Sequence, residues 1–306
     1  MAAIKETSTG RIVVLESEHV VGRGQANALC LDKRYVSTQH ATLRFTEGRW
    51  VVKDLGSRNG TFVDGNRVGS REGLELRVGS RLAFGKVEEE WELVDDSAPR
   101  AMAIPLDGGD PVELDGELLA LPSSENPRAT IYRTLDGSWV LEQTDSITPV
   151  ANRQTFELDG KVFRFCCHAN VSTTTVADPA LDLELRRARL SLAVSRDEEH
   201  VELKVTCGMK SFDLGARAHN YLLLTLGRRR LADAAEGLPS PSCGWLSPDD
   251  FPHDPAMAPA RLNLDVLRIR KQFAALGIVD APGIIERRAR SRQLRIGVEQ
   301  ITIVTI

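Results

Sequence analysis

Three short clusters in the N-terminal part of the chain carry side chains that together could hold a phosphate group. The clusters are Gly22-Arg23, Ser37-Thr38-Gln39-His40 and Ser57-Arg58-Asn59-Gly60-Thr61. A phosphate in a loop-built site needs a fixed cation, short hydroxyl groups and backbone N–H donors, which make charge-assisted hydrogen bonds. Arginine suits this task because its planar guanidinium donates at several points, which lysine cannot match. The clusters therefore predict anion binding.

Two other chemistries are compatible with single members of these clusters. Gly22-Arg23-Gly24 resembles part of a nucleotide-binding loop, but no helix is predicted after it. His40 could act as a metal ligand or a general base, but no Cys, Asp or Glu has suitable spacing to it. The chain also lacks the nucleophile elbow, Walker loop, HExxH pair and kinase signatures. We therefore predict that the protein is not an enzyme and has no cofactor or metal.

The elements around the clusters are predicted to be short strands. From Ile12 to Val94, β-branched runs such as RIVVLE, HATLRF and RWVVKDL alternate with turn signals such as Asn59-Gly60 and Asp64-Gly65. Many short strands with regular turns are typical of a β-sandwich. In such a fold the three clusters would lie on the loops between strands.

The order and spacing of the clusters resemble the forkhead-associated (FHA) family over roughly residues 10 to 95. The resemblance implies a phosphothreonine-binding β-sandwich, for which we predict domain bounds of residues 1–98. It also implies phosphopeptide-contacting residues, of which Thr38 stands where the family often has Arg or Asn and would make a weaker contact. These residues are Arg23, Ser37, Thr38, Arg58 and Asn59. Structural support of the site would come from Gly22, His40, Gly60 and Thr61. A domain that keeps the fold but binds no phosphate is the alternative.

Length and composition place these loops in a multidomain protein. The chain has 306 residues, a net charge of −4 and five cysteines, none of them in a CxxC pair. The number and spacing of the cysteines predict reduced thiols and no zinc site. The N-terminus lacks the apolar stretch of a secretory signal, and no run approaches the roughly 20 apolar residues that span a membrane. We therefore predict a cytoplasmic protein with no membrane partner.

Residues 99–178 are predicted to form a central β-rich segment. The stretch ATIYRTLDGSWVLE, from Ala129, echoes ATLRFTEGRWVVKD, from Ala41. The echo is compatible with a degenerate second FHA-like copy and equally with two unrelated hairpins. No Gly-Arg, Ser-x-x-His or Arg-Asn-Gly occurs in this segment, so no phosphate site is expected there.

Residues 179–306 are predicted to form a small sheet followed by a winged helix, an α+β domain. Strands RLSLAVS and HVELKVT precede a helix that ends at Gly237, a short helix that begins at Ser247 and a longer helix over 259–276. The remainder, from Ile284 to the final ITIVTI run, is predicted to be a β-hairpin with a basic tip. The segments LNLDVLRIRKQFAALG and IIERRARSRQLRIG resemble the output domain of OmpR-like response regulators. That resemblance implies a recognition helix and a wing.

Charge favours DNA as the partner of this domain. Residues 216–297 hold 13 Lys and Arg against 8 Asp and Glu, whereas the whole chain is acidic. The predicted DNA contacts are the basic residues Arg261, Arg268, Lys271, Arg287, Arg288, Arg290 and Arg292. On the longer helix, Leu262, Val266, Ile269, Phe273 and Leu276 form the predicted buried stripe. Leu264 and Leu267 are predicted to face outward, which is unusual for a base-reading surface.

Two hypotheses follow from the sequence. The first is a phosphothreonine-dependent transcriptional regulator that docks on a threonine-phosphorylated protein and binds DNA through its winged helix. A Ser/Thr kinase is one candidate for the phosphorylated partner. The alternative is an adaptor that reads phosphothreonine and binds another protein through its C-terminal half. Outward Leu264 and Leu267 favour the adaptor, whereas the basic balance favours the regulator.

Overall fold

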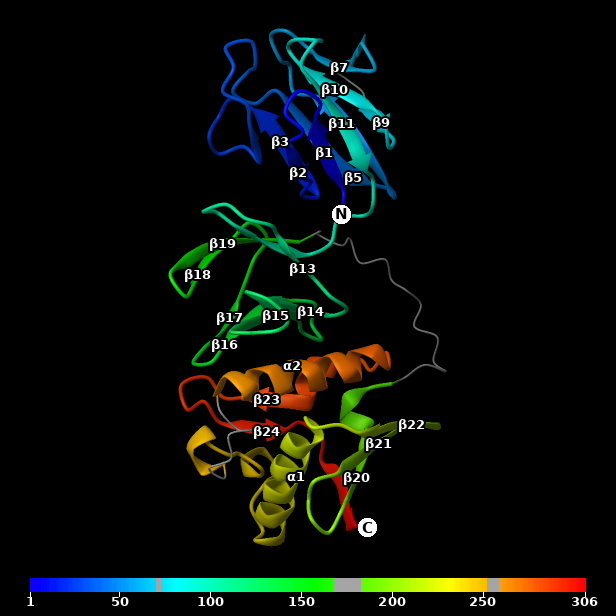
Figure 1. Ribbon diagram of the computed structural model, residues 1–306, viewed down its shortest axis with the longest axis vertical. Coiled ribbons are helices and arrows are strands. Elements are labelled where there is room, and N and C mark those ends of the chain that lie inside the picture. The colour runs from blue at the N-terminus through cyan, green and yellow to red at the C-terminus, as the bar shows by residue number, and fades with distance from the viewer. Residues whose placement is uncertain (70–72, 168–182, 252–258) are drawn as a thin grey trace. The chain divides into compact units, whose positions relative to one another are not determined.

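The chain folds into two compact units in a computed structural model (Figure 1). One unit comprises Met1–Met102 with Phe165–Val171, and the other comprises Ala103–Arg164 with Ser172–Ile306. The structure describes residues 1–69, 73–167, 183–251 and 259–306. No helix in these ranges is long and apolar enough to span a membrane. All five cysteines are free thiols, and four of them are buried.

The first unit contains an FHA-type β-sandwich, as the sequence predicts. One sheet has the order β2-β1-β11-β10-β7-β8 and the other has the order β4-β3-β5-β6-β9. The strands are β1 (Ala3–Glu6), β2 (Ile12–Val14), β3 (Glu18–Gly22), β4 (Leu29–Cys30), β5 (Ala41–Thr46), β6 (Arg49–Asp54), β7 (Thr61–Val63), β8 (Asn66–Arg67), β9 (Leu74–Leu76), β10 (Arg81–Phe84) and β11 (Glu90–Asp95). Strand β1 was missed by the sequence prediction, which began at Ile12.

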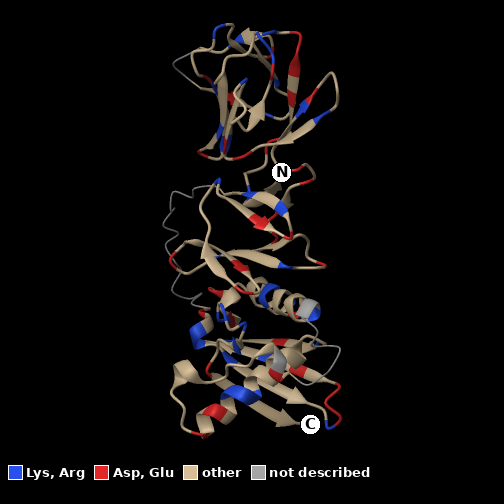
Figure 2. Cartoon of the chain, turned by 90° about the vertical axis from the view of Figure 1, so that its left-hand side faces the viewer, with Lys and Arg blue, Asp and Glu red and all other residues tan. Residues whose placement is uncertain are grey.

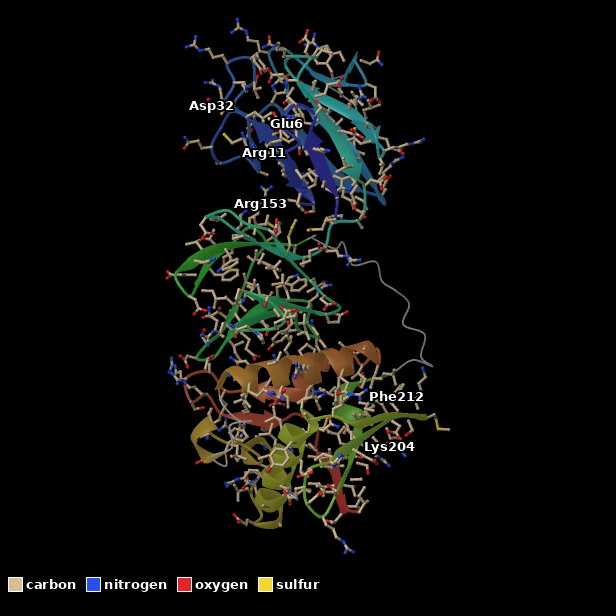
Figure 3. All side chains as sticks on the ribbon, in the orientation of Figure 1. Glu6, Arg11, Asp32, Arg153, Lys204 and Phe212 are labelled. Carbon is tan, nitrogen blue, oxygen red and sulfur yellow. The ribbon has the colours of Figure 1, made fainter. Side chains whose placement is uncertain are left out.

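Period-two alternation explains how these strands build a core. On β5 and β6, Leu43 and Val52 are fully buried and opposite each other, whereas Arg44 and Lys53 point to solvent. Alternating side chains lie on opposite faces of a strand, so one face of each sheet supplies the core. Glu6 and Arg11, labelled in Figure 3, mark the turn that joins β1 to β2.

The central segment forms two four-stranded sheets. Their orders are β13-β12-β19-β18 and β14-β15-β16-β17. The strands are β12 (Met102–Pro105), β13 (Val112–Glu113), β14 (Leu118–Leu121), β15 (Ala129–Arg133), β16 (Trp139–Gln143), β17 (Ile147–Pro149), β18 (Thr155–Leu158) and β19 (Lys161–Cys166). The echo of the sequence has a structural counterpart, because β15 and β16 form a hairpin as β5 and β6 do. Both sheets bury apolar side chains, and we call this pair of sheets the central sandwich.

The C-terminal part consists of a sheet, two α-helices and a hairpin. Strands β20 (Arg189–Val194), β21 (Val201–Cys207) and β22 (Lys210–Ala216) are followed by α1 (Asn220–Ala235) and α2 (Pro259–Ala275). Short 3-10 turns occur at Leu185–Arg187, Ser240–Ser242, Pro248–Asp250 and Ala281–Ile284. The hairpin is β23 (Ile285–Arg287) with β24 (Leu294–Ile296), and β25 (Gln300–Thr305) ends the chain. Lys204 on β21 and Phe212 on β22 mark the sheet in Figure 3.

Two expectations for this part were wrong. The capping box at Ser247 is present, but the helix it begins is a single 3-10 turn, Pro248–Asp250. The final ITIVTI run does not belong to the basic hairpin: β25 pairs in parallel with β20, and Ile301 and Ile303 pack against the core. Parallel pairing with a distant strand leaves no local signal, whereas a hairpin does, which explains the second error.

Candidate functional site

The three predicted clusters meet at one end of the first sandwich because of the strand register. Val21 at the end of β3 is opposite Ala41 at the start of β5, and Ala41 is opposite Asp54 at the end of β6. Arg23 follows β3 directly, Ser37 lies in the loop that enters β5, and Arg58 lies in the loop that leaves β6. Because adjacent strands are antiparallel, all three loops lie at the same end of the sheet.

A chain of hydrogen bonds links the loops. The Arg23 backbone N–H donates to the Ser37 carbonyl at 2.8 Å, and the Arg58 backbone N–H donates to Ser37 Oγ at 3.1 Å. The Arg23 and Arg58 side chains are exposed, and neither has a hydrogen bond or ion pair within the described residues. Two arginines without a side-chain partner among the described residues therefore lie on loops whose backbones are bonded to Ser37, and the Ser37 hydroxyl oxygen is held by a backbone donor.

His40 connects the second loop to the third. Its side chain is fully buried, its Nδ1 accepts from the Ser37 backbone N–H at 3.1 Å, and its Nε2 lies 3.0 Å from the Gly60 carbonyl oxygen. These partners require the tautomer with the proton on Nε2, because Nδ1 accepts and a carbonyl can only accept. The imidazole therefore positions loops and is not aimed at solvent.

Asn59 and Thr38 complete the predicted contact set. The Asn59 side chain is exposed, and its Nδ2 donates to the Tyr35 carbonyl at 2.8 Å. That bond fixes the amide and leaves Oδ1 as an acceptor. Thr38 is exposed, and its carbonyl accepts from Asn27 Nδ2 at 2.6 Å, so the loop backbone is held while the side chain is available.

Asp54 is a site residue that the sequence prediction missed. Its buried carboxylate accepts from the Gly56 and Ser57 backbone N–H groups, both at 2.9 Å, from Ser57 Oγ at 2.6 Å and from Thr61 Oγ1 at 2.7 Å. Burial raises the pKa of Asp54, but these hydrogen bonds outweigh burial and hold the pKa below its ordinary value. An Asp two residues before Gly-Ser is a turn signal that could have identified it.

Two glycines are required by close backbone contacts. A Cβ at Gly22 would lie 2.4 Å from the Thr38 carbonyl oxygen, and Gly60 has a φ of +88°. A side chain at either position would push the first and second loops apart or strain the third. Gly22, Gly60 and the buried Thr61 are therefore built into the geometry of the loops.

The predicted DNA-binding residues are distributed between solvent and protein. The Arg261 and Arg268 side chains are 43% and 47% exposed. Their guanidinium nitrogens lie 3.4 and 3.7 Å from carboxylate oxygens of Asp265. Lys271 is 28% exposed and donates to Asp115. Figure 2 shows that Lys and Arg positions, coloured blue, occur on several elements of the C-terminal part.

The hairpin cations are also partly engaged. The Arg288 guanidinium lies 3.9 Å from the Trp245 ring centroid, and Arg292 pairs with Asp145. Arg290, exposed at the tip, has a φ of +71°. The prediction that Arg287 is an accessible contact was wrong: its side chain is 5% exposed because it bonds Glu142 inside the second unit.

The buried stripe of α2 is as predicted over most of its length. Leu262, Val266, Ile269 and Phe273 are buried in the C-terminal core, and Leu276 packs partly buried against it. The prediction that Leu267 faces solvent was wrong. It points away from that core but is only 2% exposed, because the central sandwich covers it. Leu264 is half-buried.

Comparison with known proteins supports an FHA domain at the N-terminus. The FHA domain family matches residues 19–85. FHA domain-containing protein FhaB of Mycobacterium tuberculosis is 35% identical over 80 residues, which are 26% of this chain and 50% of FhaB. Nibrin of Danio rerio is 33% identical over 82 residues, 27% of this chain and 10% of nibrin. This chain thus spans about half the length of FhaB.

Solved structures resemble about a third of this chain. Mycobacterium tuberculosis EmbR in complex with a low-affinity phosphopeptide is 26% identical, with a TM-score of 0.29, over 32% of this chain and 25% of that chain. A chain from an analysis of phosphothreonine-dependent FHA domain interactions is also 26% identical, with a TM-score of 0.27, over 30% of this chain and 92% of its own length. The match of the FHA domain family over residues 19–85 is what identifies an FHA domain in the N-terminal region.

Proposed function

We propose that this chain is a phosphothreonine-dependent signalling protein that docks on a threonine-phosphorylated partner through its FHA domain. The observation that carries this proposal is the linkage of Arg23, Ser37 and Arg58, in which both guanidinium groups are unpaired within the described residues. The FHA match and the phosphopeptide named with EmbR support it. A Ser/Thr kinase is one candidate for the partner.

Each contact has a chemical reason. Ser37 Oγ accepts from the Arg58 N–H, so its own O–H is free to donate to a phosphate oxygen. Arg23 and Arg58 supply charge-assisted donors, and Asn59 Oδ1 accepts from a peptide N–H beside the phosphothreonine. Thr38 adds an uncharged accessory contact. The role is one of binding, with no catalytic residue and no cofactor.

Phosphothreonine-peptide binding by an Arg23→Ala variant tests the site. We expect wild type to select phosphorylated over unphosphorylated peptides from a library, and Arg23→Ala to lose at least about tenfold in affinity. Arg77→Ala is the matched control, because Arg77 is 82% exposed and precedes β10, whose other end pairs with Thr61 beside the site. Unchanged binding by Arg23→Ala would overturn the assignment, and no binding by wild type would mean that the domain does not read phosphothreonine.

For the C-terminal half, DNA is the second candidate ligand. The basic balance of residues 216–297 and exposed Arg261 and Arg268 favour a transcriptional regulator. Against DNA contact, Arg287 of the hairpin is already bonded to Glu142. Leu267 of α2 is covered by the central sandwich and is not open to an external protein, so the adaptor is favoured only by half-buried Leu264. DNA binding by the full chain at several salt concentrations separates the two. A regulator should lose affinity steeply with salt, since phosphate contacts release counterions, and an adaptor should not bind DNA even at low salt.

A further inference from the structure

The two sandwiches share a strand order, which makes their faces comparable position by position. The first contains β3-β5-β6-β9 and β2-β1-β11-β10, and the second contains β14-β15-β16-β17 and β13-β12-β19-β18. The cross-strand register also matches, because Leu121 is opposite Ala129 as Val21 is opposite Ala41. Each position on the β14–β17 sheet therefore has an equivalent in the FHA domain.

The outward face of the β14–β17 sheet differs in chemical character from the equivalent face of the FHA domain. In the FHA domain, Glu18 and Arg44 are opposite each other, form an ion pair at 2.8 Å and are 49% and 59% exposed. The equivalent positions in the central sandwich hold Leu118 and Tyr132, which are also opposite each other. Leu118 is fully buried. A solvated, charged face in one sandwich is an apolar, covered face in the other.

Helix α2 provides the cover. Leu267 of α2 packs in one buried cluster with Leu118 and Ala120, and Tyr132 packs against the same cluster. The Arg270 guanidinium lies over the Tyr132 ring, 5.1 Å from its centroid. Figure 1 shows α2 between the β14–β17 sheet and the β23–β24 hairpin. The helix thus has two buried sides, one in its own core and one on the sandwich.

A buried charge network fixes this contact. Glu142 of β16 accepts two hydrogen bonds from Arg270, at 3.1 and 2.9 Å, and one from Arg287 at 3.2 Å. Arg270 also donates to the Ile285 carbonyl at 2.7 Å. The three charged side chains are between 1% and 5% exposed. The equivalent of Glu142 in the FHA domain is exposed Lys53, so this carboxylate is specific to the central sandwich.

Further pairs surround the buried network. Lys271 donates to Asp115 at 2.6 Å and to Ser124 at 3.0 Å. At the hairpin tip, the Arg292 side chain pairs with Asp145, whose carbonyl accepts from the Arg290 backbone N–H at 3.1 Å. Carboxylates of the sandwich therefore meet cations from both the helix and the hairpin.

We infer that the central sandwich is an internal docking platform for α2 and the hairpin, and that its carboxylates hold cations which a polyanion would otherwise bind. The first half of this inference rests on the contacts above, and the second half rests on the proposed DNA-binding candidate. Nucleic-acid phosphates must displace Asp115, Glu142 and Asp145 to reach Lys271, Arg287 and Arg292. The apparent DNA affinity is then the intrinsic affinity multiplied by the fraction of molecules in which the platform is undocked.

The FHA domain itself supplies the variant that tests the platform. The double variant Leu118→Glu/Tyr132→Arg places on the central sandwich the Glu–Arg pair that the FHA domain carries at the same positions. Its net charge is that of wild type, so long-range attraction to DNA is unchanged. Leu106→Glu/Val162→Arg is the matched control. Leu106 directly follows β12 and donates its backbone N–H to Val162 of β19, and the two side chains are already 49% and 42% exposed.

Two readouts on the full chain separate docking from DNA binding. Amide hydrogen exchange reports the protection of α2, and fluorescence anisotropy reports binding of a labelled 20-base-pair duplex (roughly two turns of B-DNA). We expect Leu118→Glu/Tyr132→Arg to increase exchange in α2 and to raise DNA affinity roughly tenfold or more over wild type and control. This result supports both halves of the inference.

The other outcomes are equally decisive. Faster exchange in α2 without a gain in DNA affinity supports the platform and overturns competition with a polyanion, and DNA leaves the proposed function. Unchanged exchange in α2 overturns the platform itself, whatever DNA does. If β15 and β16 also lose protection, the sandwich has unfolded, and Asp115→Lys/Asp145→Lys takes its place. Both aspartates are largely exposed, so that variant keeps the fold, and Asp107→Lys/Asp110→Lys matches its charge.

Discussion

At the scale of single residues, the loops of the proposed phosphate site, which carry Arg23, Ser37 and Arg58, depend on two buried side chains that the proposed ligand does not touch. His40 joins Ser37 to Gly60, and Asp54 joins the turn at Ser57 to Thr61. Each of these side chains satisfies loop donors or acceptors that would otherwise be buried without partners, which costs about 1–3 kcal/mol per group. The shape of these loops is therefore fixed by side chains that are buried beneath the proposed binding surface.

An Asp54→Ala variant tests this division of roles. We expect phosphothreonine-peptide affinity to fall at least about tenfold, and the free energy of unfolding to fall by about 1–3 kcal/mol, because several donors lose their acceptor together. Calorimetric titration and urea unfolding measure the two quantities. Asp96→Ala is the control, since Asp96 is exposed and has no hydrogen bond or ion pair within the described part of the chain. Full affinity in Asp54→Ala would show that the turn holds its shape without the carboxylate.

The sequence predicted which loop residues lie together, including His40 and Gly60 as support, but it missed Asp54. The contacts of Arg23, Ser37 and Arg58 with a phosphate stay a prediction. Asp54 was missed because a single acid at a strand end is common, and its role emerges only when Ser57 and Thr61 fold back onto it. Leu267 of α2 and Arg287 of the hairpin were placed in solvent because their partners lie more than 100 positions away in the sequence.

At the scale of elements, the β23–β24 hairpin is anchored by an aromatic side chain that contacts two of its arginines. The Arg288 and Arg295 guanidinium groups lie 3.9 and 4.5 Å from the Trp245 ring centroid. Trp245 Nε1 donates to the Pro241 carbonyl at 3.0 Å, and Arg295 also donates to Glu286. The hairpin is short, and two-stranded hairpins are marginal alone, so these contacts contribute to its order.

A Trp245→Ala variant should loosen the hairpin selectively. Two cation–π contacts at partly exposed positions contribute about 0.5–1 kcal/mol each, so we expect faster amide exchange in β23 and β24 and a loss of about 1–2 kcal/mol. Trp245→Phe keeps a ring and should lie between Trp245→Ala and wild type. Equal protection of the hairpin in all three proteins would show that pairing of the strands and Arg287 suffices.

The elements that local patterns specify were predicted from the sequence, and those that depend on distant pairing were not. The apolar stripe of α2 and the strands β5 and β6 repeat at helical and strand periods. The parallel pairing of β25 with β20 has no such period, because it is set by the core that Ile301 and Ile303 join. The repeated hairpin at Ala129 could be recognised in the sequence, but the cover of its outer face by α2 could not.

At the scale of the whole molecule, two compact units predict two unfolding transitions. The loops of the proposed phosphate site lie in one unit, and the Glu142 network lies in the other. A ligand that binds only the folded state stabilises its own unit, by about 2.7 kcal/mol at a concentration 100 times Kd. Differential scanning calorimetry with saturating phosphothreonine peptide should therefore raise one transition and leave the other in place. A single transition that shifts as a whole would show that the units unfold together.

Glu142→Gln should act on the other transition, and pH should report why. Burial raises the pKa of Glu142, but Arg270 and Arg287 outweigh burial and hold it below its ordinary value. A pKa lowered in the folded state stabilises the fold at pH values above the unfolded-state pKa, and this stabilisation is lost as pH falls through the folded-state pKa.

At neutral pH, Glu142→Gln leaves two arginines buried without their carboxylate, which costs about 3–5 kcal/mol. We therefore expect a lower second transition in Glu142→Gln, with a weaker dependence on pH below about 4.5 than in wild type, since the variant has no carboxyl to protonate. Equal acid sensitivity of the two proteins would place the titrating group elsewhere in the unit.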